Sequence, residues 1–180
     1  SFEANFLKQK VLWRKKGLDK EINKNYKYTP RVINQELKWR NNVKAGLFIY
    51  ENNESQQALS LNTGPELTLG SMKKNFLDYT KMAATSTYVF KSGESPFAFD
   101  NIDDTFRIKF DLDQQLYGPL VLNLSSYLNL DSSDKNYGSF VESKFGLNFQ
   151  RRAYKVSIYY KPDAKSLGIN FDIFNFDYSG

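Results

Sequence analysis

Two aspartates, Asp111 and Asp113, have a spacing that would suit acid–base chemistry. Residues two apart on a β-strand point to the same side, so the two carboxylates would lie one pleat apart. Paired carboxylates catalyse glycoside hydrolysis, in which one donates a proton and the other acts as base or nucleophile. An acidic pair is also common on a solvated strand face, and we therefore expect no enzyme.

A second acidic group, Asp100, Asp103 and Asp104, contains the oxygen ligands that calcium prefers. The group lacks the D-x-D-x-D-G spacing and the closing glutamate of a calcium-binding loop. The chain has no cysteine and no histidine, which excludes disulfides, thiol nucleophiles, histidine triads and Cys or His metal sites. We therefore expect no metal and no cofactor.

The positive charge of the chain is concentrated near its beginning. Residues 1–50 contain 12 Lys and Arg against 4 Asp and Glu, whereas residues 51–180 contain 13 against 16. The basic stretch 14–31 interleaves Tyr26 and Tyr28 with lysines, a composition that suits the phosphates of nucleic acid or of an anionic lipid. It matches no ordered nucleic-acid module and is more typical of a solvated loop. We interpret it as a long loop or a poorly specified hairpin and expect no nucleic-acid partner.

The elements that would position these residues show the alternation of β-strands. In residues 105–117 the even positions are mostly apolar and the odd positions polar, which gives a strand with one apolar and one polar face. The pattern returns in residues 120–130, 145–149 and 154–160, separated by polar turns. Strands joined by short turns pair antiparallel, because a parallel return needs about a dozen residues or more. The sequence thus predicts an all-β, antiparallel up-and-down meander.

Further strands are expected earlier in the chain, over residues 2–13, 33–40, 43–50, 59–69 and 76–90. Asn41-Asn42 predicts a turn between two of them, because Asn tolerates positive φ. Gly64-Pro65 predicts a strand end or a bulge, because proline cannot donate to a central ladder. Residues 91–104 form the main interruption, a loop with Phe97 and Phe99. We expect about ten or eleven strands and no helix longer than about two turns.

The last strand contains a change of phase. Apolar residues occupy odd positions from Leu167 to Ile173 and even positions from Phe174 to Tyr178. A slip of one residue turns every later side chain to the other face of the sheet. The sequence therefore predicts either a β-bulge near Ile173-Phe174 or a strand that leaves the lipid band of a membrane barrel there.

This alternation fits two kinds of protein. A soluble β-barrel or sandwich would enclose its apolar face and bind a lipid or other amphiphilic ligand. A transmembrane barrel would turn that face to lipid, with strands of about 9–11 residues and a polar interior. Periodicity alone favours the soluble fold, because such folds are commoner. The length of the segments, the charged opposite face and the tyrosines near strand ends count in the other direction, towards the membrane barrel.

Five sequence blocks, in the same order, resemble a known family. They are residues 75–80 (NFLDYT), 93–97 (GESPF), 115–119 (QLYGP), 151–154 (RRAY) and 174–180 (FNFDYSG). Together they are similar to the C-terminal β-barrel region of the cyanobacterial LptD-like family, which is regarded as the cyanobacterial counterpart of the lipopolysaccharide translocon of the outer membrane. The resemblance covers residues 37–180, and residues 1–36 add little to it.

The resemblance implies an outer-membrane β-barrel that receives lipopolysaccharide or a related glycolipid from periplasmic lipopolysaccharide-bridge proteins. The barrel would insert the glycolipid into the outer leaflet, with no chemistry of its own. Barrels of this family are large and carry an N-terminal periplasmic domain. Residues 1–180 would therefore be one β-barrel segment, in which residues 1–36 add a strand and the basic loop. The first and last strands of such a segment would be unpaired edges.

The alternation also divides the strands into two candidate faces. The candidate polar lumen face comprises Arg107, Lys109, Asp111, Asp113, Gln115, Asn123, Ser125 and Asn129. The candidate lipid face comprises Phe106, Ile108, Phe110, Leu120, Leu122, Leu124, Leu128, Val156 and Ile158.

Overall fold

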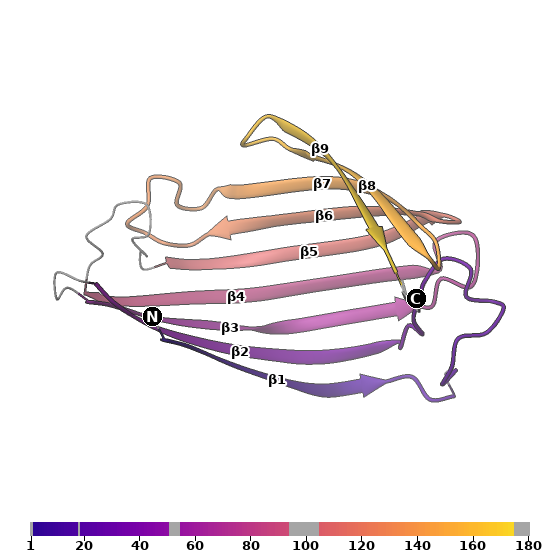
Figure 1. The fold of residues 1–180 in the computed structure, drawn as a ribbon, viewed down its shortest axis with the longest axis horizontal. Coiled ribbons are helices and arrows are strands. Elements are labelled where there is room, and N and C mark those ends of the chain that lie inside the picture. The colour runs from indigo at the N-terminus through magenta and orange to yellow at the C-terminus, as the bar shows by residue number, and fades with distance from the viewer. Residues whose placement is uncertain (1, 18, 51–54, 94–104, 175–180) are drawn as a thin grey trace, which may run out of the picture.

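A computed structural model describes residues 2–17, 19–50, 55–93 and 105–174, which form one antiparallel sheet of nine strands in chain order (Figure 1). The strands are β1 (Phe2–Arg14), β2 (Glu36–Ile49), β3 (Ser55–Gly70), β4 (Tyr79–Gly93), β5 (Thr105–Tyr117), β6 (Leu120–Asn129), β7 (Phe140–Gln150), β8 (Tyr154–Lys161) and β9 (Ser166–Ile173). The predicted all-β meander is confirmed. A search of the described residues finds no helix with the length and apolar character to cross a membrane.

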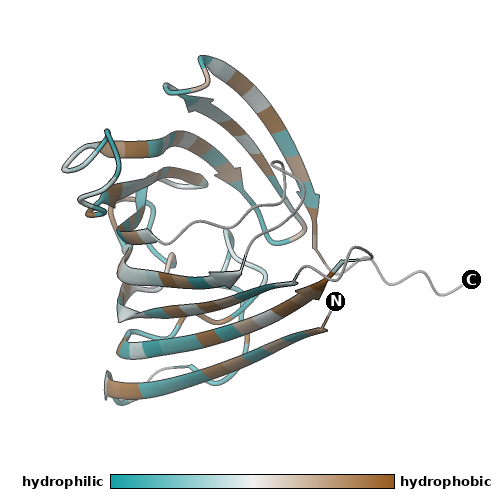
Figure 2. Cartoon of the chain, turned by 90° about the vertical axis from the view of Figure 1, so that its left-hand side faces the viewer, coloured by the Kyte–Doolittle hydropathy of each residue, from teal (hydrophilic) through white to brown (hydrophobic). Residues whose placement is uncertain are grey.

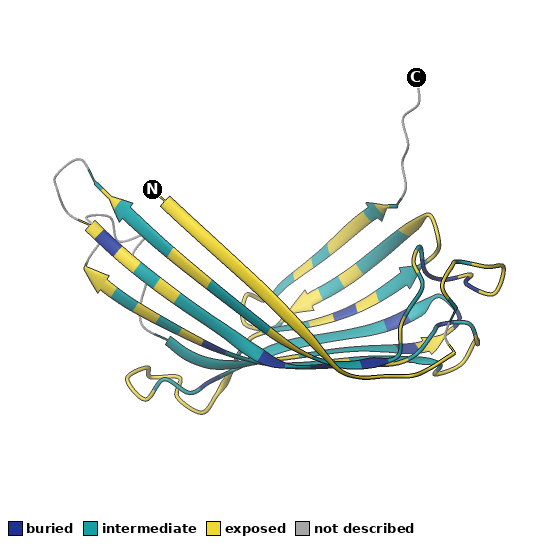
Figure 3. Ribbon diagram, turned by 90° about the horizontal axis from the view of Figure 1, so that it is seen from below, coloured by how far each residue is buried: buried dark blue, intermediate teal, exposed yellow. Residues whose placement is uncertain are grey.

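The sheet is bent into an open trough and is not closed into a barrel (Figure 3). Among the described residues, β1 pairs only with β2, and β9 pairs only with β8. Each of these two strands therefore keeps a row of backbone groups without a strand partner. The two edges expected of the first and last strands are present, and Phe171 on β9 is exposed.

The expected turn at Asn41-Asn42 is wrong, because β2 runs through both residues without a break. Asn41 lies opposite Lys8 and Thr63, and Asn42 lies opposite Leu7 and Asn62. The carboxamide oxygen of Asn41 accepts hydrogen bonds from Thr63 Oγ1 at 2.7 Å and Trp39 Nε1 at 3.2 Å. Cross-strand partners thus satisfy a residue that sequence reasoning assigned to a turn. The merger of two expected strands leaves nine in the described residues, not ten or eleven.

Gly64-Pro65 lies inside β3, which is neither ended nor bulged there on its β2 side. On the β4 side, the paired residues skip from Thr63 to Glu66, since Pro65 has no N–H to donate. A Cβ on Gly64 would come within 2.9 Å of the Ala84 carbonyl carbon. The glycine therefore allows β4 to approach β3 closely at the point where the proline removes a hydrogen bond.

The register gives the sheet two continuous faces, which we call the polar face and the apolar face. One cross-strand row of the polar face runs through Thr68, Lys81, Asp113, Asn123, Gly146, Tyr159 and Gly168. The adjacent row of the apolar face runs through Leu67, Met82, Leu112, Leu124, Phe145, Tyr160 and Leu167. Figure 2 shows the resulting alternation of hydrophilic and hydrophobic residues along the curved strands.

The polar face lines the concave side of the trough. The buried polar residues within the strands lie on this face: Glu36, Gln56, Glu66, Thr68, Thr87, Gln115 and Asn129. Large residues of the apolar face are instead exposed, among them Phe90, Phe110, Phe145 and Ile169. Curvature explains the difference, because side chains converge on the inside of a bent sheet and spread apart on the outside.

β1 departs from the expected alternation. The pairing of β1 with β2 shifts between Val11 and Trp13, which leaves Leu12 as an extra residue. Leu7 and Val11 consequently lie opposite Asn42 and Lys38 on the polar face, whereas Trp13 lies opposite Leu37 on the apolar face. Regular alternation would put these three apolar residues, all at odd positions, on one side of the strand, and the bulge separates them.

The connection between β1 and β2, residues 15–35, folds over the concave side at one end of the trough. Tyr28 packs with Met72 and Val121 in a small buried cluster, against which Ile33 and Tyr79 also pack. The Tyr28 hydroxyl donates a hydrogen bond of 2.8 Å to Asn75 Oδ1 in the connection between β3 and β4. The tyrosines of the basic stretch are therefore anchors of a loop, with Tyr26 and Tyr28 both buried.

The start of β4 and the end of β9 can be compared with the expected strands. The expected strand over residues 76–90 begins at Tyr79 instead, and Phe76 forms an isolated bridge with Tyr117. β9 ends at Ile173, where the change of phase occurs, and Phe174 N donates a hydrogen bond of 2.7 Å to Ala153 O. The phase change thus coincides with the end of the strand. Phe176 and Tyr178 lie outside the described residues.

Candidate functional site

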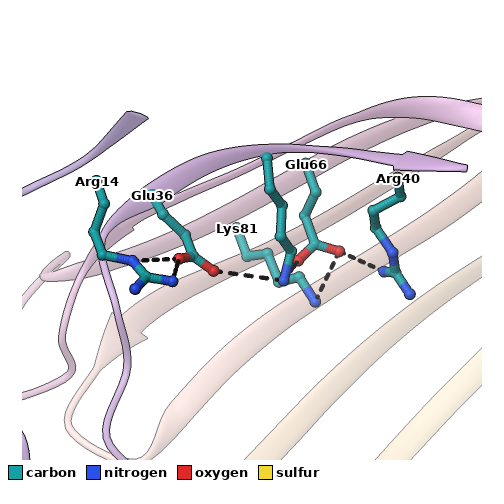
Figure 4. A network of polar contacts seen from close by, with 6 residues as sticks. Arg14, Glu36, Arg40, Glu66 and Lys81 are labelled. Atoms are coloured by element: carbon teal, nitrogen blue, oxygen red, sulfur yellow. Dashed lines mark hydrogen bonds and ion pairs between the residues drawn. The ribbon is translucent and has the colours of Figure 1, made fainter. Parts of the chain in front are cut away.

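A ladder of charged side chains crosses the polar face from β1 to β4 (Figure 4). Arg14 donates to Glu36 at 2.6 Å, and Lys38 Nζ lies 3.6 Å from the other oxygen of Glu36. Glu66 then pairs with Lys38 at 2.9 Å, with Arg40 at 2.6 Å and with Lys81 at 3.5 Å. Four cations thus surround two carboxylates, so this half of the concave face carries a positive excess.

Glu66 is the centre of this ladder, and its side chain is only 4% exposed. A buried carboxylate is costly unless it is paired, and here the two neighbouring strands β2 and β4 supply its three partners. The partners are themselves partly exposed, with Lys38 at 19% and Arg40 at 45% side-chain accessibility. The buried Glu66 therefore holds its cationic partners together, while the charged ends of Lys38 and Arg40 remain partly accessible from the open side of the trough.

The eight residues of the candidate polar lumen face all lie on the polar face, on β5 and β6. Lys109 pairs with Asp111 at 2.9 Å, and Asn123 donates to Asp113. Arg107 pairs with Glu142 at 2.9 Å, and its guanidinium carbon lies 4.4 Å from the centroid of the Tyr127 ring. The structure thus brings these residues together on one surface. Asp111 and Asp113 each have a partner there.

Two of the eight residues have structural roles. Gln115 is fully buried and donates to Lys74 O at 3.0 Å and to Gly118 O at 2.8 Å. Its carboxamide oxygen accepts from Asp78 N at 3.0 Å, so the side chain ties two connections to the end of β5. Asn129 donates to Asp134 Oδ2 at 2.9 Å and accepts from Asp131 N at 3.0 Å, which orders the connection between β6 and β7.

The other half of the concave face, from β6 to β9, is amide-rich. A hollow of about 310 Å³ there is lined by polar groups that include Asn123, Asn148, Ser157 and Asn170. A second hollow of about 270 Å³ shares Asn123, Asn148 and Lys155 with the first and extends towards Thr29 and Ile33 of the connection between β1 and β2. The two hollows together form one polar groove, and the connection between β1 and β2 borders this groove at one end.

The nine residues of the candidate lipid face all lie on the apolar face, on β5, β6 and β8. Phe110 and Ile158 are exposed, at 42% and 49%. A shallow depression of about 670 Å³ crosses this face and is lined by residues such as Leu67, Met82, Leu112 and Leu124. The apolar face therefore offers a broad surface to an apolar environment and has no covering element among the described residues.

An ion pair outside the sheet holds the connection between β1 and β2 in place. Lys73 pairs with Asp19, and its ammonium lies 4.9 Å from the centroid of the Tyr26 ring. The hydrogen bond from Lys73 lowers the pKa of Asp19 below its ordinary value of 3.8, and the same bond raises the pKa of Lys73 above 10.5. Burial raises the pKa of the Tyr26 hydroxyl. The Asp19–Lys73 pair is thus charged over a wide pH range.

Metal-ligand geometry is not found in the part of the chain that the structure describes, where no group of three or more acidic side chains could hold an ion. Asp100, Asp103 and Asp104 lie outside the described residues.

The sequence interpretation missed the residues of the charged ladder. Residues 36, 38 and 40 alternate with apolar neighbours, which is the same signal that identified the polar positions of β5. Glu66 follows a proline at a site where a strand break was expected, and only the register shows that Lys38 and Lys81 flank it. A period-two pattern gives the face of each residue but not its neighbours on other strands.

The fold and the site together define an open antiparallel meander sheet with a charged, amide-rich concave face and an exposed apolar convex face. Residues 1–177 match the family described as "Protein of unknown function (DUF3769)", and the chain belongs to this family. No curated protein and no solved structure matches the chain.

Proposed function

We propose that this chain forms part of a larger outer-membrane β-barrel that transports lipopolysaccharide or a related glycolipid into the outer leaflet. The observation that carries the proposal is the exposed apolar face, which continues from β2 to β9. Contiguous apolar surfaces of more than a few hundred Å² are rare on soluble monomers and mark an interaction surface. In the proposal, lipid acyl chains cover this face.

The dimensions of the strands support a membrane position. The strands are between 8 and 16 residues long, and crossing the apolar part of a bilayer takes about 9–11 residues of a tilted strand. The polar, charged concave face then corresponds to a wet interior.

The open edges support the idea of a larger barrel. Lipid cannot satisfy the unpaired backbone groups of β1 and β9, so a membrane-embedded sheet has to be completed by further strands. In the proposal these strands come from outside the described sheet. The transport role is supported by the five sequence blocks that resemble the cyanobacterial counterpart of LptD. Partners then include the periplasmic bridge proteins that deliver the glycolipid.

The test is conditional depletion of the full-length parent protein in its host. We expect less glycolipid at the cell surface, measured by labelling whole cells, and a more permeable outer membrane. The protein should remain with outer membranes after alkaline extraction. A protein recovered in the soluble periplasmic fraction would favour the soluble amphiphile-binding alternative, and unchanged surface glycolipid would refute the transport role.

A further inference from the structure

An aromatic ring lies across the concave face in the amide-rich half of the trough. Tyr159 on β8 has a glycine on each side of it in the sheet, Gly146 on β7 and Gly168 on β9. A Cβ on Gly168 would come within 2.8 Å of Tyr159 Cε2 and closer still to the ring carbon that bears the hydroxyl. The ring therefore occupies the space where a side chain at position 168 would stand.

This arrangement makes the ring of Tyr159 a stacking platform, a flat aromatic surface on which a sugar ring would lie. A ring that leans over a glycine backbone is supported from beneath, and the ammonium groups of Lys144 and Lys161 lie over the Tyr159 ring. The face of an aromatic ring is electron-rich and attracts C–H groups that carry a partial positive charge. The C–H face of a sugar ring has this character, whereas its hydroxyl groups point outwards and need hydrogen-bond partners.

The hollow next to Tyr159 supplies such partners. Asn123 and Asn170 each donate one N–H to a neighbouring aspartate and retain a second N–H and the carboxamide oxygen. Asn148 offers a further carboxamide, and Ser157 adds a hydroxyl. Carboxamides and hydroxyls can satisfy a sugar hydroxyl in either hydrogen-bond role. The hollow of about 310 Å³ is polar in its lining and lies on the concave side of the sheet.

The charge at this hollow is positive. Lys144 Nζ lies 4.2 Å and Lys161 Nζ 5.8 Å from the centroid of the Tyr159 ring. Lys155 pairs with Asp172 at 2.8 Å, whereas Lys144 has no ion-pair partner among the residues that the structure describes. An anionic substituent on a sugar would provide an ion-pair partner that draws the Lys144 ammonium away from the Tyr159 ring and leaves the ring free for the sugar.

We propose that this hollow binds an acidic sugar of a glycolipid head group, stacked on Tyr159 and paired with Lys144. The inference deepens the proposed function and rests on it for the glycolipid as the natural ligand. A bare inorganic anion would use the lysines and leave the ring and the three carboxamides unused. The combination of platform, amides and cation therefore selects a sugar with a negative charge.

The test uses the full-length protein purified in detergent micelles and three defined probes: trigalacturonate, maltotriose and inorganic phosphate. Saturation-transfer NMR detects the sugar protons that contact the protein, and calorimetric titration gives the affinity. We expect trigalacturonate to bind more tightly than maltotriose and phosphate. Tyr159→Leu should weaken trigalacturonate binding about tenfold, since it removes the stacking surface.

The neighbouring residue provides a matched control. Tyr160 is the same residue type on the same strand, but it lies on the apolar face opposite Phe145 and Leu167. Tyr160→Leu should leave the affinity unchanged. Lys144→Gln should reduce the preference for trigalacturonate over maltotriose, and Gly168→Val should act like Tyr159→Leu because its side chain displaces the ring.

Three outcomes would overturn the inference: no trigalacturonate binding by the wild-type protein, equal losses in Tyr159→Leu and Tyr160→Leu, or phosphate binding as tight as that of trigalacturonate. The last would indicate an anion site without sugar recognition. Sugar binding that depends on Tyr159, combined with unchanged surface glycolipid after depletion, would refute the transport role and leave the sugar site standing.

Discussion

Arginine substitutions along β6 provide a direct test of the membrane position of the apolar face. Leu120, Leu124 and Leu128 all lie on this face, with Leu124 near the middle of the strand and opposite Leu112 and Phe145. At ~3.4 Å per residue and a tilt of ~40°, the two outer leucines lie about 10 Å above and below the level of Leu124. The lipid-facing band of a membrane barrel is ~25 Å tall, so these two positions fall near its borders.

The expected costs follow from this depth. An arginine near the bilayer midplane destabilises a barrel by ~2–4 kcal/mol, and near the interface by only ~0–1 kcal/mol. We therefore expect Leu124→Arg to lower the free energy of unfolding by ~2–4 kcal/mol, and Leu120→Arg and Leu128→Arg by ~1 kcal/mol or less. Ser125→Arg is the control, because Ser125 lies on the polar face opposite Asp111.

The assay is urea unfolding of the full-length protein in phospholipid vesicles, followed by the fluorescence of tryptophans such as Trp13 and Trp39. A second sheet packed on the apolar face of a soluble protein would bury all three leucines, so arginine would be costly at each of them. Equal costs at positions 120, 124 and 128 would therefore refute the membrane reasoning. A cost for Ser125→Arg as large as that for Leu124→Arg would contradict the assignment of the two faces.

Three further expectations concern stability. Glu66→Gln should destabilise the protein by about 1–3 kcal/mol in urea unfolding, since it leaves three cations without their shared carboxylate. The added change Lys38→Met should recover part of the loss. If Glu66→Gln leaves the stability unchanged, Glu66 does not hold the ladder together. Gln115→Leu should lower the free energy of unfolding by about 1–3 kcal/mol and speed amide exchange in residues 71–78, because backbone groups lose their buried partners. Unchanged amide exchange in residues 71–78 would contradict this role of Gln115. Because the pKa of Asp19 is lowered, the contribution of Asp19 to the free energy of unfolding is complete above its ordinary pKa of 3.8 and is lost as the pH falls through the lowered value. The contribution of Lys73 is lost as the pH rises through a pKa above 10.5. The tyrosine near-ultraviolet circular dichroism should change as the pH falls through the acidic range, and Lys73→Met should abolish that change.

The sequence was sufficient for the fold class and for the faces of β5 and β6. In these strands long apolar residues alternate with polar ones at most positions, which leaves only one way to segregate them. The same reasoning placed all seventeen candidate face residues on two opposite surfaces of one sheet. That one surface meets lipid and the other lines a lumen remains a prediction.

The errors arose where tertiary contacts outweigh local preference. Asn41 stays in a strand because two neighbouring side chains hydrogen-bond to its oxygen. Leu7 and Val11 change face because of one extra residue at position 12. The partners of Glu66 lie on other strands, and the platform at Tyr159 depends on glycines that are its neighbours only through the register. No pattern within a single strand contains this information.

The two edge strands of the described sheet differ in length, and this affects how further strands can be added to it. β1 extends over 13 residues and β9 over 8, so the side of the sheet formed first offers the longer template for strand addition. Until neighbouring strands dock, both edges and the outer apolar surface would invite self-association in water. If the chain forms part of the proposed barrel, it would need protection by a chaperone until further strands pair with both edges.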